Sequence, residues 1–174
     1  ALKGAGVLLL SYRKPTAARA FLWGVMAGAG FALVEGIFNS MLGLGTWGMT
    51  MALRAAATAM HAAGGGLSGL GWQALAAQRR VGRFLALYLG AIALHGSWNA
   101  AAGGLSYVGL QVTGDPGNVT ALMGQGLLAL FLIACLFILL LGATAVLAYG
   151  ARCLTVDARR AEPLSSPAAQ QAAE

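Results

Sequence analysis

Long apolar runs separated by short polar segments make up most of this chain. Four of them cover residues 20–42, 50–76, 84–104 and 119–150, and a shorter one covers residues 1–12. A helix of about 20 residues, rising about 1.5 Å per residue, crosses about 30 Å of hydrocarbon. The pattern therefore predicts four full membrane spans and one partial N-terminal span.

These runs are expected to be helices rather than strands. Backbone polar groups in lipid must be satisfied internally, and Ala and Leu dominate the runs without any alternation of apolar and polar positions. We therefore predict an all-α, polytopic transmembrane helix bundle. The run 119–150 is longer than a bilayer requires, so we expect it to tilt or to emerge into water.

The composition excludes a soluble domain. Of 174 residues, 59% are hydrophobic and only 9% are charged, which is too little charge for a water-facing surface. The 26 glycines lie largely inside the apolar runs, where small residues let helices approach closely. Cys135 and Cys153 have no paired spacing, so neither a disulfide framework nor a cysteine metal knuckle is indicated.

The basic residues report topology. They occur in short clusters beside the runs, in every second connection, and this distribution indicates membrane sidedness rather than nucleic-acid binding, despite a net charge of +6. The positive-inside rule places these connections in the cytoplasm and the loop that carries Asp115 outside. The clustered basic residues are Arg13, Lys14, Arg19, Arg79, Arg80, Arg83, Arg152, Arg159 and Arg160.

The chain divides into one helical domain over residues 1–160 and a tail over residues 161–174. The tail is rich in Ala, Ser, Pro and Gln, so we expect it to be disordered and cytoplasmic. The first run is too short to cross alone and lacks the features of a signal peptide, so we expect the chain to be the C-terminal part of a longer protein. Lys is scarce compared with Arg, Ala and Gly, and this composition suggests a bacterial protein of the cytoplasmic membrane.

A few polar residues interrupt the apolar runs. An ionisable side chain at the bilayer centre costs at least about 2.5 kcal/mol, so such residues are candidates for function. Their spacing of four or seven places both members of each pair on one helix face. The pairs are Glu35 with Asn39, Arg54 with His61, and His95 with Asn99.

Depth in the membrane brings these groups together. Glu35 and Asn99 lie about 24 Å from the cytoplasmic arginines that precede their runs, and His95 lies about 18 Å away. His61 enters from the opposite side, about 17 Å below an outward turn. The sequence therefore predicts one polar layer, nearer the outside. Each residue alone also has a structural explanation, as a helix-packing hydrogen bond or a charge partner.

The ordered motifs resemble a known family. Residues 31–35 read F-x-x-x-E, His61 follows on the next run, and residues 95–99 read H-x-x-x-N. This set, over about residues 1–103, resembles the PrsW-type glutamic intramembrane proteases, which are related to type II CAAX prenyl proteases and to a non-catalytic gamma-secretase subunit. The family's first motif, E-E-x-x-K, is represented only by Lys3, so its two glutamates would precede Ala1.

The resemblance implies an intramembrane peptidase that uses a glutamate-activated water. The catalytic base would come mainly from the upstream glutamate, with Glu35 as its partner. His95 and Asn99 would donate hydrogen bonds to the tetrahedral oxyanion. His61 would orient the water or protonate the leaving amine.

Further residues are assigned supporting roles. Lys3, Phe31 and Asn39 belong to or follow the motifs, and Arg54 would neutralise a carboxylate or extend to the membrane interface. The expected substrate is a single-pass membrane protein, with anti-sigma factors as the family's associated example. We expect no cofactor and no nucleic-acid partner.

Three alternatives remain open on the sequence. Glu35, His61 and His95 could hold Zn²⁺ with one position left for water, although no H-E-x-x-H helix is present. The chain could be a non-catalytic scaffold that binds partner helices through its small-residue faces. It could also be a transporter that relays protons, although the 174 residues show no inverted repeat.

Overall fold

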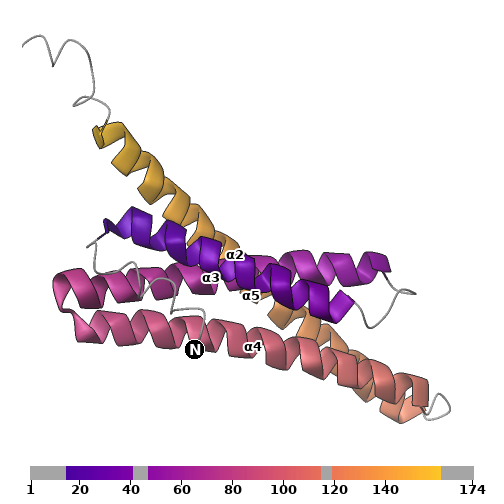
Figure 1. The fold of residues 1–174 in the computed structure, drawn as a ribbon. Helices are drawn as coiled ribbons and strands as arrows, with labels where there is room; N and C mark the ends of the chain where they lie inside the picture. Colours follow the sequence, from indigo (N-terminus) through magenta and orange to yellow (C-terminus); the bar gives the residue numbers. More distant parts are fainter. Residues whose placement is uncertain (1–14, 41–46, 115–118, 162–174) are drawn as a thin grey trace, which may run out of the picture.

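A computed structural model describes residues 15–40, 47–114 and 119–161, and these form four α-helices (Figure 1). The described residues contain no strand, so the predicted all-α class is confirmed. The partial N-terminal span, Lys3 and the tail beyond residue 161 lie outside the described residues. The helices are α2 (Ala17–Ser40), α3 (Trp47–Gln78), α4 (Val81–Gly114) and α5 (Val119–Ala161).

Local signals explain where the helices begin and end. Thr16 precedes α2 and its Oγ1 accepts a hydrogen bond from Arg19 N at 3.3 Å, as an N-cap does. Arg79, at φ 53°, takes the left-handed conformation that follows many helix ends, and a short turn then leads into α4. Helix α4 continues ten residues beyond the predicted end at residue 104, because no proline occurs before Pro116.

Helix α3 lies at the centre of the bundle. It packs against α2, α4 and α5, and α3 and α4 run antiparallel as a long hairpin that α5 crosses obliquely (Figure 1). No Cα atom of α2 lies within 8 Å of one of α4 over the described ranges. The buried core joins α3, α4 and α5 and consists of Met60, Ala63, Trp98, Ala101, Leu136 and Ala143.

A glycine seam holds α2 against α3. A Cβ atom added to Gly28 would overlap the carbonyl oxygen of His61, and one added to Gly24 would overlap that of Gly65. Gly69 is equally close to Ala20. For these glycines the predicted packing role is confirmed, since only a hydrogen in place of a side chain permits such close backbone approach.

The outer surface of the bundle is apolar. Leu33, Phe38 and Leu127 are each 68–69% exposed, which in water would be costly and in lipid is favourable. Length and hydropathy mark Ala17–Phe38 and Thr120–Val156 as able to cross a membrane, and only 22% and 11% of those windows are buried. The molecule is therefore a helical membrane bundle.

The lengths of the other helices also suit a membrane. Helices α3 and α4 have 32 and 34 residues, long enough to span, but their hydropathy falls below the level reached by α2 and α5. For α3 and α4, the predicted full membrane span therefore stays a prediction. Helix α5 has 43 residues, about 64 Å at 1.5 Å each, so it exceeds any bilayer, as its apolar run suggested.

Candidate functional site

The first pair at the site joins α2 to α3. Glu35 Oε2 lies 2.6 Å from His61 Nε2, which makes a short hydrogen bond and, when the imidazole is protonated, an ion pair. His61 is 4% exposed, whereas the Glu35 side chain is 37% exposed. The seam explains the contact, because Gly28 abuts His61 and lies two turns before Glu35 on the same face of α2.

The second pair lies on α4 and meets the first. The rings of His61 and His95 are 4.7 Å apart between centroids and tilted by 47°. Asn99 Nδ2 lies 3.2 Å from His95 Nε2. Because an amide nitrogen only donates, His95 accepts at Nε2 and its ring proton is on Nδ1. Glu35, His61, His95 and Asn99 thus form one continuous row of polar groups across three helices.

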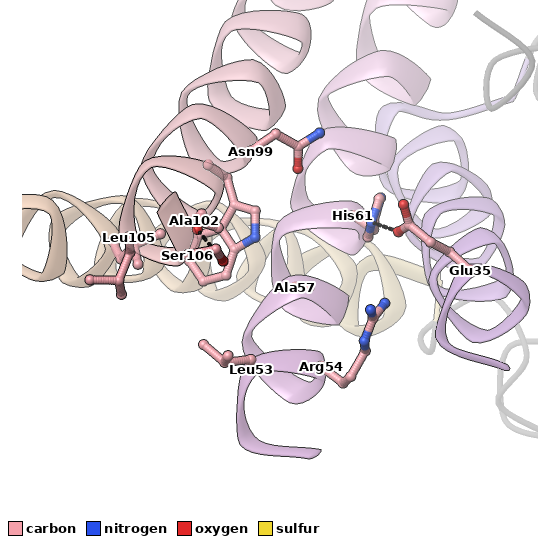
Figure 2. A pocket seen from close by; sticks show the side chains of 11 residues that line it. Glu35, Leu53, Arg54, Ala57, His61, Asn99, Ala102, Leu105 and Ser106 are labelled. Carbon is pink, nitrogen blue, oxygen red and sulfur yellow. Dashed lines mark hydrogen bonds and ion pairs between the residues drawn. The ribbon is translucent and has the colours of Figure 1, made fainter. Parts of the chain in front are cut away.

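A cavity of about 260 Å³ opens beside this row (Figure 2). Glu35, His61, Asn99 and Arg54 line it, together with Ser106, whose hydroxyl donates to the Ala102 carbonyl at 3.0 Å. A water molecule occupies about 30 Å³, so the cavity accommodates a water beside part of a peptide. The remaining wall is apolar, formed by Leu53, Ala57, Trp98, Ala102, Leu105 and Leu136.

Most residues singled out from the sequence gather here. Phe31 lies 5.3 Å from His61 between ring centroids, so the F-x-x-x-E motif places both of its named residues on one histidine. Arg54, two turns before His61, lines the same cavity. The side chain of Asn39 and the whole of Lys3 lie outside the described residues, so their predicted roles stay untested. The catalytic roles stay predictions.

Sequence reasoning missed some residues of the site. Ser106 lies seven residues after Asn99, and this spacing places both on one face of α4 and could have identified it. Gly24 and Gly28, by contrast, are expected from the sequence to be packing residues, and their small-xxx-small spacing is the known signature of close helix approach. Leu136 comes from α5, and nothing in its sequence neighbourhood predicted its place in the cavity wall.

Comparison with known proteins gives one family. The chain matches the family described as PrsW family intramembrane metalloprotease over residues 1–140. The chain belongs to the PrsW family. No curated protein and no solved structure matches it. The match extends beyond the motifs into α5, which contributes Leu136 to the cavity.

Membership in the PrsW family gives the coarse function. The chain is an integral membrane protein and an intramembrane peptidase, and its substrates are membrane proteins within the bilayer. The predicted protease and membrane assignments are confirmed at this level.

The word metalloprotease in the family description raises the question of a metal. Two donors on one tetrahedral zinc stand about 3.3 Å apart, whereas the Glu35 and His61 donor atoms are hydrogen-bonded at 2.6 Å. Over the described helices, no three His, Cys, Asp or Glu side chains group as metal ligands. In this arrangement Glu35, His61 and His95 are not placed as a zinc site, while the family description leaves a metal open.

Proposed function

We propose that this PrsW-family protein hydrolyses a peptide bond of its membrane-protein substrate with a water molecule activated at Glu35. The observation that carries the proposal is the row of polar groups beside a cavity of about 260 Å³: Glu35 is hydrogen-bonded to His61, the His61 ring contacts the His95 ring, and His95 is hydrogen-bonded to Asn99. Polar groups on apolar helices are costly unless they are paired, and here they converge on a space large enough for a water and part of a peptide.

Proton transfer begins at Glu35. Its Oε2 is held by His61, and no hydrogen bond within the described helices engages its Oε1. A water in the cavity gives its proton to this carboxylate while its oxygen bonds to the carbonyl carbon of the substrate. The resemblance assigns Glu35 as the partner of the main base, and we propose it here as the residue that accepts the proton.

The tetrahedral intermediate requires a donor for its oxyanion. Asn99 lines the cavity and donates one hydrogen of Nδ2 to His95, and we propose that its second Nδ2 hydrogen is available to the substrate oxygen. His95 is the positioning residue for Asn99. The peptide C–N bond then breaks, and the amine leaves with the proton that Glu35 took from water, passed directly or through His61.

The proposed substrate is a single-pass membrane protein cut in the outer half of the bilayer, such as an anti-sigma factor. The site is reached through apolar helix faces, and the positive-inside rule places the polar layer nearer the outside. An extended, unwound segment of a membrane helix would offer its backbone to the cavity. We further propose that residues 1–160 act as one membrane domain, followed by a cytoplasmic tail.

The test uses the full-length protein, co-expressed and then purified with single-pass reporters. Glu35→Gln keeps a hydrogen-bonding partner for His61 but removes the proton acceptor, so we expect cleavage to fall by about 10²- to 10⁴-fold. His95→Ala should also lower cleavage strongly, because Asn99 loses its support. Thr144→Ala, an exposed position on α5 away from the cavity, is the control and should cleave normally.

One outcome would exclude the proposed mechanism. Reporter cleavage that survives in both Glu35→Gln and His95→Ala would show that these residues do not perform the reaction, and it would favour the non-catalytic scaffold or another site. Cleavage absent from the wild-type protein with every reporter would also count against the proposed substrate class.

A further inference from the structure

Arg54 is the cationic side chain of the cavity, and the reaction proposed above does not use it. The side chain is half-buried and lines the cavity with Leu53, Ala57 and Leu105. The ion pair at the site joins Glu35 to His61, and over the described helices no carboxylate lies within ion-pair distance of Arg54. A charged group against apolar walls is costly without an anionic partner.

The direction of the side chain argues against a purely interfacial arginine. Figure 2 shows the Arg54 guanidinium turned into the space that Glu35 and His61 face, not away from it. An arginine that extends to the membrane surface would turn its head group out of the cavity. The guanidinium therefore presents a positive charge to the cavity.

We propose that Arg54 is a specificity-determining residue that binds the carboxylate of an Asp or Glu side chain in the substrate. The inference rests on the proposed function, because it places the same substrate in the same cavity. Arginine presents a planar fork of donors that matches a carboxylate, and such charge-assisted hydrogen bonds are among the strongest in proteins.

The spacing along α3 gives the position of the acidic residue. Arg54 precedes His61 by seven residues, two helical turns, which is about 10.5 Å along the axis. An extended peptide advances about 3.3 Å per residue, so this distance corresponds to about three residues. Because the guanidinium is turned towards His61, we place the acidic side chain one to three residues from the scissile bond.

The lining of the cavity places Arg54 and the reacting groups along one path. Glu35 of α2 and several residues of α4 line the cavity over α3, and over the described ranges no Cα atoms of α2 and α4 lie within 8 Å of each other. A segment lying along α3 between them would pass Arg54 and Glu35 in turn. A single peptide could thus contact the specificity residue and the reacting groups together.

The experiment measures kcat/KM for reporters that differ at one position. Asp or Glu is compared with Asn or Gln at each of three positions on either side of the scissile bond. With the wild-type protein, we expect one position at which the acidic reporter is preferred by about ten-fold. In Arg54→Gln the ratio of kcat/KM for the acidic reporter to that for the neutral reporter should fall to about one. In Arg83→Gln, an exposed arginine outside the cavity, the preference should persist.

A charge swap provides the second arm. Arg54→Glu should disfavour the acidic reporter and should favour a reporter with Lys at the same position, so that the preference reverses. No preference in the wild-type protein at any position, or a preference unchanged in Arg54→Gln, would overturn the proposal. If Arg54→Glu lowers kcat/KM equally for all reporters and does not raise it for the Lys reporter, Arg54 pairs with a carboxylate of the protein itself and the proposal is overturned.

A third arm separates the substrate from lipid. Cleavage is compared in vesicles of phosphatidylcholine alone and with added phosphatidylglycerol. A lipid dependence that Arg54→Gln abolishes, with no change in reporter preference, would assign the charge to a lipid phosphate and refute the proposal. Glu35→Gln is included throughout. Normal cleavage by this variant would defeat the proposed function. If Glu35→Gln is inactive but the wild-type protein shows no preference among the reporters, only this inference is defeated.

Discussion

Gly28 determines how closely α2 can approach α3 beside His61. A Cβ added there would overlap the carbonyl oxygen of His61, well inside the 3.0 Å that real Cβ atoms respect, and would stand 3.1 Å from Ala62 Cα. Both obstacles are backbone atoms, which cannot swing aside as a side chain can. In Gly28→Ala the two helices must therefore separate, by at least about 1.3 Å, before the contact reaches van der Waals range.

That separation acts directly on the site. The Glu35–His61 hydrogen bond is 2.6 Å long, and an added separation of about 1.3 Å takes it to about 3.9 Å, where it no longer counts as a hydrogen bond. Displacing a reacting group by about 1 Å can lower the rate by about 100-fold. Overpacking of this kind also costs about 1–3 kcal/mol of stability. We expect Gly28→Ala to show both effects.

The matched control is Gly30→Ala. A Cβ on Gly30 meets nothing within 4 Å, and alanine is the better helix former, so activity and thermal stability in detergent should equal or exceed those of the wild type. Gly24→Ala loosens the same seam one turn further from Glu35, so it should lose similar stability but less activity. Wild-type cleavage by Gly28→Ala, or equal activity losses in Gly24→Ala and Gly28→Ala, would refute the reasoning.

Other predictions concern the same bundle. Asn99→Ala should lower kcat about 100- to 1,000-fold with little change in KM, since it removes an oxyanion donor; a KM effect alone in steady-state kinetics would assign it to substrate binding. Trp98→Ala, at a site 6% exposed, should destabilise the protein by about 3 kcal/mol in thermal unfolding, while Leu130→Ala, 66% exposed, should not. Cleavage should persist in the presence of a chelator, and metal-content measurement should find no stoichiometric zinc; loss with chelator and recovery with zinc would restore the metal mechanism. A cysteine at Asp115 should react with an impermeant label from outside intact cells, and failure would reverse the predicted sidedness.

The amino-acid sequence by itself determined the helices and the residues of interest. Hydropathy over 20 residues and the need to satisfy backbone hydrogen bonds in lipid are local properties, so the positions of α2 to α5 could be predicted without knowing their neighbours. Glu35, His61, His95 and Asn99 stood out for the same reason, because each is expensive in an apolar run. Helix spacing and depth even predicted that they would share one layer.

Only the tertiary structure decided which helices meet and which partners pair. Helix association in lipid has no hydrophobic driving force and depends on close shape fit, which a linear pattern does not reveal. Gly28 and Gly30 look alike in the sequence, yet one abuts His61 and the other faces open space. In the same way, the packing of α2 on α3 pairs Glu35 with His61, while Arg54 lines the cavity. This pairing defines the site.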